Sequence, residues 1–320
     1  MKRFLSLSLL IVALVSACTG KGNQEESNLP TIHTTLFLTY DFAKAIAGDK
    51  MHVELFVPAG VDTHTYEPSA NDMLKAQKSA LFLWTSSTME PWMPKLIESL
   101  NIEKQSVNLA DALHLHELNG GEGHDHHDHD HEHHHHHDND PHFWMNPNFL
   151  LPLFDAVTQS IIAQDPDNRT YYETNAQIYR EELQAIITDA QEIVATSPKH
   201  PLLFGGGFSH QAFLTAYNLP YFSVYASDSI ENEPTIAHLA TIRQAIQEQG
   251  LIYIFVDPML TTKIATTLAE DYNLLILPWH TGHTLNKEDL DAEVSYLDLL
   301  KENNDYLLLA LHNQPVLPSN

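Results

Sequence analysis

Residues 169–197 read RTYYETNAQIYREELQAIITDAQEIVATS, and this stretch decides the fold. Apolar side chains recur in it at spacings of 4, 3, 4, 4, 3 and 4 residues, at Tyr172, Ala176, Tyr179, Leu183, Ile187, Ala190 and Val194. This spacing is the 3.6-residue period of an amphipathic helix, and neither Gly nor Pro interrupts it before Pro198. The segment therefore predicts one helix longer than the globular average, which could form a spine between two lobes.

Short apolar runs alternate with helical patterns on both sides of this helix. The runs that resemble strands cover residues 32–38, 53–57, 81–84, 202–204, 221–225, 251–256 and 274–277. The helical patterns cover residues 41–47, 69–79, 147–164, 211–216, 235–249, 262–272 and 292–303. This alternation predicts two α/β lobes with parallel sheets, in which ligands bind at the carboxyl ends of the strands.

We therefore divide the mature chain into three parts. An N-terminal α/β lobe is expected at residues 30–164, a linking helix at 165–197 and a C-terminal α/β lobe at 198–320. The cleft between the two lobes is the expected place of the binding site.

The first residues have the pattern of a bacterial export signal. Lys2 and Arg3 precede an apolar run over residues 4–15 that is too short to span a bilayer stably. The run ends in a sequence resembling a lipobox, so we expect a signal peptide at residues 1–17, a lipidated Cys18 and a polar leader at 18–29. A plain secretory signal with an incidental cysteine is the alternative. In both cases the mature protein lies outside the cytoplasm, in a periplasm or at the cell surface.

Composition narrows the class of protein further. The chain has 42 acidic against 16 basic side chains and a net charge of -26, which argues against a nucleic-acid partner. Cys18 is the only cysteine, so the mature chain has no disulfide, and any metal site must use His, Asp and Glu.

A histidine-rich tract indicates that the protein handles metal ions. Residues 124–137 read HDHHDHDHEHHHHH, with ten histidines and four carboxylates in fourteen positions. These side chains are ligands for divalent cations, and the tract has no apolar residue with which to form a core. We expect a disordered loop over residues 114–138 that collects metal, with an ordered site elsewhere.

Three separate histidines are candidates for that ordered site. His64 follows the strand at 53–57, His142 lies directly after the tract in DPHFWMNP, and His210 follows the strand at 202–204 at the start of a helix. Each could instead be a capping or core-edge imidazole bonded to the backbone. Their spacing forms no local motif, so the residues alone leave both interpretations open.

The chain resembles the metal-binding lipoproteins of bacterial zinc and manganese ABC importers, and the zinc branch in particular. The resemblance covers nearly the whole mature chain, through the segments TYDFAKAIAGDK, VPAGVDTHTYEPSANDMLKAQKSALFLW, DPHFWMNP, DPDNRTYYETNAQIYREEL, SHQAF, FVDPML and SYLDLLKENNDYLLLAL. It implies two α/β lobes joined by one long rigid helix, with a metal site in the inter-lobe cleft. It also implies that His64, His142 and His210 are ligands, and a histidine at the third position is typical of the zinc type.

The fourth ligand position departs from the family pattern. Many relatives have an aspartate after the last strand of the second lobe, whereas this chain reads LLILPWHTGHTL there. His280 falls at roughly the aligned place and closest to the strand, and we expect it to be the ligand because Gly282 would turn His283 away. His283 or a water molecule are the alternatives, and both histidines could be surface residues of a loop.

These features predict a monomeric, extracytoplasmic Zn²⁺-binding lipoprotein that delivers its ion to an ABC permease and its ATPase. The ion is a transported ligand, and no catalysis is expected. A zinc hydrolase is one alternative, because three histidines and an open position also suit catalysis, although the chain has no HExxH motif outside the histidine-rich tract. A metal-buffering or adhesive surface lipoprotein of the same fold is another.

Overall fold

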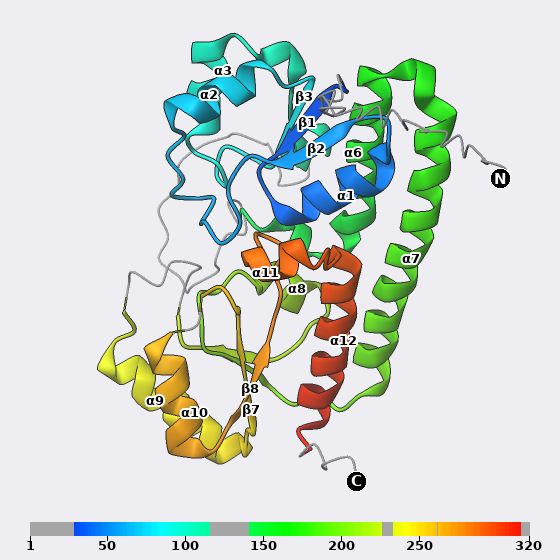
Figure 1. Ribbon diagram of the computed structural model, residues 1–320. Helices are drawn as coiled ribbons and strands as arrows, with labels where there is room; N and C mark the ends of the chain where they lie inside the picture. Colours follow the sequence, from blue (N-terminus) through cyan, green and yellow to red (C-terminus); the bar gives the residue numbers. More distant parts are fainter. Residues whose placement is uncertain (1–28, 116–140, 226–232, 261, 315–320) are drawn as a thin grey trace, which may run out of the picture.

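The computed structural model describes residues 29–115, 141–225, 233–260 and 262–314. They form two α/β lobes stacked one above the other, and one long helix runs along the side of both (Figure 1). This helix is α7, Arg169–Thr196, and the apolar residues of its predicted period are buried. The predicted two-lobe α/β architecture is confirmed.

The N-terminal lobe is built on a four-stranded parallel sheet in the order β2-β1-β3-β4. Its strands are β1 Thr31–Thr34, β2 His52–Leu55, β3 Leu81–Trp84 and β4 Ser106–Asn108. Its helices are α1 Phe37–Ala47, α2 Ala70–Gln77, α3 Met93–Leu100, α4 Leu109–Ala112 and α6 Pro147–Gln164, with single turns η1 Glu103–Gln105, η2 Phe143–Met145 and η3 Pro166–Asn168.

The C-terminal lobe repeats this plan with a parallel sheet in the order β6-β5-β7-β8. Its strands are β5 Leu202–Phe204, β6 Tyr221–Ser223, β7 Tyr253–Val256 and β8 Leu275–Pro278. Its helices are α8 Gln211–Ala216, α9 Ile236–Gln249, α10 Lys263–Tyr272, α11 Lys287–Asp291 and α12 Tyr296–His312.

The largest differences from the predicted bounds are found at β1, α1 and α12. The run at 32–38 is divided, because β1 ends at Thr34 and α1 begins at Phe37. The last helix begins at Tyr296, where Ser295 and Asp298 form a capping box, and it continues to His312.

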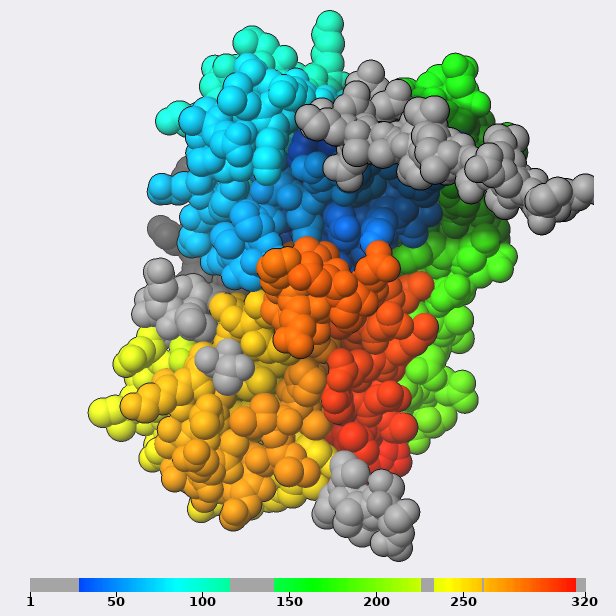
Figure 2. Space-filling view, in the orientation of Figure 1, coloured from blue at the N-terminus to red at the C-terminus, as the bar shows by residue number. Residues whose placement is uncertain are grey.

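The two lobes are joined by one continuous apolar core as well as by α7. Its buried side chains come from α1, α6, α7 and α12, while two smaller clusters lie within the individual lobes. Asp41 of α1 marks the junction, because its Oδ2 accepts hydrogen bonds from the Tyr179 hydroxyl of α7 at 2.6 Å and the Tyr296 N–H of α12 at 3.0 Å. Figure 2 shows the segment around α11, in orange, lying directly against the blue N-terminal lobe.

Among the residues described, no helix is long and apolar enough to cross a membrane.

Candidate metal centre

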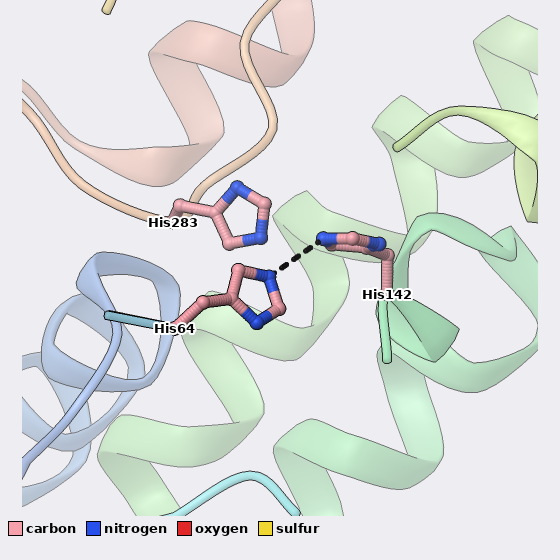
Figure 3. A group of neighbouring side chains, drawn as sticks. All are labelled: His64, His142 and His283. Carbon is pink, nitrogen blue, oxygen red and sulfur yellow. Dashed lines mark hydrogen bonds between the residues drawn. The ribbon is translucent and has the colours of Figure 1, made fainter. Parts of the chain in front are cut away.

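Three histidines from distant parts of the chain meet between the lobes. His64 lies in the loop between β2 and α2, His142 directly precedes η2, and His283 follows β8. One ring nitrogen from each lies within 4.8 Å of those of the other two. The three rings point toward one another (Figure 3).

The spacing of these nitrogens matches ligands on a single ion. Nε2 of His64 lies 3.4 Å from Nε2 of His142. Two imidazoles that bind a tetrahedral zinc at about 2.0–2.1 Å have nitrogens about 3.3 Å apart. The pair is therefore already at the separation that zinc coordination requires.

The histidines line a cavity that both lobes enclose. Its volume is about 330 Å³, and its walls include Gly60 and Thr65 from the first lobe and Asp257 and Met259 from the second. A site in this place would hold its ligand between the carboxyl ends of the two sheets, as expected for an open α/β fold.

His64 is positioned by its own loop. Its backbone N–H donates to Oδ1 of Asp62 at 2.9 Å. The indole Nε1–H of Trp92 donates to the carbonyl of Thr63 at 2.9 Å, which ties this loop to the body of the first lobe.

His142 is the most buried of the three, with 1% of its surface exposed. Trp144 lies two residues further on, and its indole Nε1–H donates to the carbonyl of Thr281 at 2.9 Å. This bond crosses from the first lobe to the loop that carries His283, so the segments of these two histidines are held together.

His283 has the most defined environment of the three rings. Its Nδ1 lies 3.0 Å from the hydroxyl of Thr281, whose proton is donated to Oδ2 of Asp257, also at 3.0 Å. Its Nε2 is buried and has no hydrogen-bond partner among the residues that the structure describes. Burial, followed by the neighbouring rings of His142, His64 and His210, holds the pKa of His283 well below its ordinary value. A neutral ring with an available nitrogen is the state that binds a metal ion.

His210 lies nearby but outside this group of three. It is the N-cap residue of α8, as predicted, and it is buried. Its ring stacks on Phe204 at a centroid distance of 4.6 Å and lies 6.0 Å from the rings of Phe208 and Trp279. The adjacent Ser209 lines the cavity, and His210 contributes to the lowered pKa of His283.

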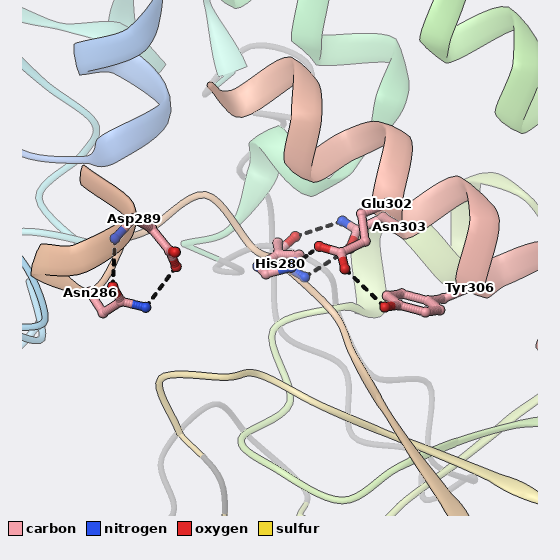
Figure 4. Close-up of polar contacts among 6 residues, drawn as sticks. All are labelled: His280, Asn286, Asp289, Glu302, Asn303 and Tyr306. Carbon is pink, nitrogen blue, oxygen red and sulfur yellow. Dashed lines mark hydrogen bonds and ion pairs between the residues drawn. The ribbon is translucent and has the colours of Figure 1, made fainter. Parts of the chain in front are cut away.

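His280 is placed differently from our expectation. Its Nε2 lies 2.8 Å from Oε2 of Glu302, and its backbone N–H and carbonyl both bond to the side chain of Asn303, so it faces α12 (Figure 4). The structure therefore brings His283, and not His280, beside His64 and His142.

Gly282 explains this difference. It adopts a φ of +78° and makes the turn that the sequence suggested. The turn directs His283 into the cleft instead of away from it, because the first N–H groups of α1 bind this loop. Phe37 N–H donates to the carbonyl of His283 at 2.9 Å, and Leu38 N–H donates to that of Gly282 at 3.0 Å.

Asp257 is a buried acidic residue of the cavity that the sequence analysis did not single out. It directly follows β7, and it is 7% exposed. Burial raises the pKa of its carboxyl group, while hydrogen bonds from Met259 N–H and Thr281 act in the opposite direction. A carboxylate directly after a buried parallel strand was the available signal in FVDPML.

Four sequence-based expectations lie outside the described residues. They are the signal peptide at 1–17, the lipidated Cys18, the polar leader except its last residue, and the histidine-rich tract at 124–137.

Comparison with known proteins gives a consistent family. Residues 32–309 match the family model of the periplasmic zinc-uptake complex component A, ZnuA. The chain is similar to the high-affinity zinc uptake system protein ZnuA of Bacillus subtilis (strain 168), with 32% identity over 303 residues that cover 93% of each protein. It is 30% identical over 302 residues to the zinc-binding lipoprotein AdcA of Streptococcus pneumoniae, covering 93% of this chain and 59% of AdcA.

A solved structure agrees with these sequence matches. The Zn(II)-bound ZnuA-like domain of Streptococcus pneumoniae AdcA superposes with a TM-score of 0.71 at 25% identity, covering 89% of this chain and 99% of that domain.

Proposed function

The chain belongs to the family of periplasmic zinc-uptake components, ZnuA, and on this basis we propose that it captures Zn²⁺ outside the cytoplasmic membrane and delivers it to an ABC permease. Members of this family are substrate-binding components of importers and not enzymes, so the hydrolase interpretation is set aside. Zn²⁺ is the cargo of the proposed site.

The observation that carries this proposal is the 3.4 Å separation of the His64 and His142 Nε2 atoms beside His283, inside a cavity between the lobes. We assign these three histidines as ligands, and as the fourth His210, which the family resemblance implies and which is buried at the start of α8 next to Ser209 of the cavity wall. His283 takes the place that the sequence suggested for His280.

This set of ligands supports zinc as the preferred ion. Imidazole nitrogen suits Zn²⁺ in a tetrahedral site, whereas Mn²⁺ prefers oxygen ligands. Four neutral imidazoles leave the bound site with the full charge of the ion, and the nearby carboxylate of Asp257 accepts a hydrogen bond from Thr281.

The extracytoplasmic placement and the importer partnership follow from the family, and three finer statements are part of the proposal. The signal at residues 1–17 directs export, a lipid on Cys18 anchors the mature chain to the membrane, and the protein docks as a monomer on the permease and its ATPase.

The test is a competition titration of Zn²⁺ against a chromophoric chelator, using the purified protein and single alanine variants. His64→Ala, His142→Ala and His283→Ala should each weaken Zn²⁺ binding strongly, because each removes a ligand and leaves both lobe cores intact. His280→Ala is the matched control, since it removes an imidazole from the same loop and should keep near-normal affinity. Strong loss in His280→Ala with none in His283→Ala would reverse the assignment, and normal affinity in all three ligand variants would refute the site.

Selectivity is measured in the same assay with Mn²⁺ in place of Zn²⁺. The wild-type protein should bind Zn²⁺ far more tightly. Equal or tighter binding of Mn²⁺ would contradict zinc as the cargo.

A further inference from the structure

We propose that Asp257 and Thr281 act as a positioning pair that fixes the ring tautomer of His283, so that its Nε2 lone pair faces the ion. This inference rests on the proposed function, because it assigns a role within the same site. In this inference neither residue is a ligand of the ion.

The hydrogen bonds determine where each proton lies. Thr281 has one hydroxyl proton, and Oγ1 donates it to Oδ2 of Asp257 at 3.0 Å. An ionised carboxylate only accepts, so that proton is not available to His283. In the 3.0 Å hydrogen bond between Oγ1 of Thr281 and Nδ1 of His283, the ring N–H must then be the donor.

A neutral imidazole that carries its proton on Nδ1 has an unprotonated Nε2. This is the nitrogen of His283 that is buried without a hydrogen-bond partner in the described part of the chain. The pair thus leaves the lone pair of a ligand directed at the place where His64 and His142 converge.

The carboxylate is held firmly enough to perform this role. Asp257 directly follows β7, and its Oδ1 accepts the N–H of Met259 at 2.8 Å. Asp257 and Thr281 are 7% and 3% exposed, so water has little access to compete for these bonds. Carboxylate groups that orient metal-binding histidines in this manner raise the basicity of the ligand as well as fixing its ring.

Thr281 also connects this chain of bonds to the first lobe. Its carbonyl accepts the indole N–H of Trp144, two residues after His142. The backbone carbonyl of Thr281 is therefore bonded from the first lobe, and its hydroxyl is bonded to Asp257 of the second.

The experiment uses the full chain and three threonine variants. Thr281→Val removes the hydroxyl and keeps the shape, and Thr281→Ser keeps the hydroxyl. Thr158→Val is the matched control, because it removes a buried hydroxyl in α6, away from the cavity, that donates to the carbonyl of Phe154 in the same helix at 2.9 Å. Removing an outer partner of a ligand typically lowers metal affinity about 10–100-fold, and we expect this loss of Zn²⁺ affinity in Thr281→Val alone.

The second readout is the protonation of the ring nitrogens in metal-free, ¹⁵N-histidine-labelled protein. Long-range ¹H–¹⁵N spectra, assigned by the signals lost in His283→Gln, should show Nδ1 of His283 protonated and Nε2 unprotonated. Thr281→Val should give a mixture of tautomers, and Thr281→Ser should retain the wild-type form. A role confined to stability would not change the tautomer.

Two results would overturn the inference: a protonated Nε2 in the metal-free wild-type protein, or unchanged tautomer and Zn²⁺ affinity in Thr281→Val. If Thr281→Val does not fold, the tautomer of His283 in the wild-type spectrum still tests the inference. If the wild-type protein bound no Zn²⁺ tightly, the proposed function would fail, whereas the spectrum of the metal-free protein would still test the positioning pair.

Discussion

At the scale of single residues, Gly282 determines where His283 points. Its φ of +78° is left-handed, and a Cβ at this position would lie 2.6 Å from Cε2 of Tyr296 and 3.3 Å from Cβ of Leu38. Gly282→Ala is therefore expected to strain the turn and push its loop away from α1 and α12. We expect a lower midpoint of urea unfolding together with weaker Zn²⁺ binding in the chelator competition.

Gly250 provides the control for this variant. Its φ is +60°, but apart from its chain neighbours no atom of the described residues lies within 4 Å of a Cβ placed there. Gly250→Ala should lower the free energy of unfolding by the conformational strain alone, on the order of 1 kcal/mol, and leave Zn²⁺ affinity unchanged. A Gly282→Ala protein that matched Gly250→Ala in both measurements would show that the turn does not place the ligand.

The same turn shows how far single residues could be predicted from the sequence. His64 was a candidate because it follows a strand, and the family resemblance made it a predicted ligand. The choice between His280 and His283 was different, because it depends on N–H groups of α1 that belong to the other lobe. The first N–H groups of a helix have no partner within it, so α1 takes the carbonyls of Gly282 and His283. No residue in the loop itself encodes that contact.

At the scale of elements, α1, α7 and α12 are joined by the carboxylate of Asp41. It accepts the Tyr179 hydroxyl and the Tyr296 N–H, so Asp41→Ala leaves two donors without their acceptor. We expect this change to lower the free energy of unfolding by about 1–3 kcal/mol, the cost of leaving buried polar groups unpaired. Asp41→Asn retains an acceptor oxygen and should be milder in urea titrations. Asp155→Ala is the control, because its partner Arg180 lies in an exposed pair.

The effect of Asp41→Asn on stability should change with pH in a definite direction. Burial raises the pKa of the Asp41 carboxyl above its ordinary value, although the hydrogen bond from Tyr179 lowers it in part. The folded state therefore holds this proton to higher pH than the unfolded state, whose pKa is about 3.9. The contribution of Asp41 to stability falls as pH rises from this value through the folded pKa. The free energy of unfolding of Asp41→Asn, relative to that of wild type, should therefore be higher at neutral pH than at acidic pH. The opposite trend would contradict the raised pKa of Asp41.

The elements themselves were largely predictable. The long helix and the short apolar strands follow from periodicity, which is a property of the local sequence. The predicted starts of α1 and α12 were both wrong, but only the start of α12 has a local sequence signal. Ser295 and Asp298 form a capping box that the sequence displays, whereas Leu36 precedes α1 with no side-chain cap. The cap of α1 comes from the loop of the other lobe, so only the folded chain contains it.

At the scale of the whole molecule, we expect two kinds of metal site. The cleft holds ligands fixed by hydrogen bonds and packing, whereas the tract at 124–137 has no apolar residue that could form a core. If the tract is the disordered loop that its sequence predicts, its ligands must lose chain entropy before they chelate an ion, so the tract should bind more weakly. Deleting residues 114–138 should remove the weak sites and leave one tight site in a Zn²⁺ titration. Unchanged stoichiometry after the deletion would refute binding by the tract.

The two kinds of site should lose Zn²⁺ at different pH values. Imidazoles in a polar tract should have a pKa near the reference value of about 6.5, so protons displace the metal there as pH falls from about 7 toward about 5. In the cleft, burial and neighbouring rings hold the pKa of His283 well below that value, and this ligand remains neutral when the tract is already charged. We therefore expect Zn²⁺ to leave the tract first and the cleft at lower pH. Chelator competition at successive pH values, on the full chain and on the protein lacking residues 114–138, measures both losses. The shortened protein should show only the second loss, and the expected order would be contradicted if its tight site were lost over the same pH range as the weak sites.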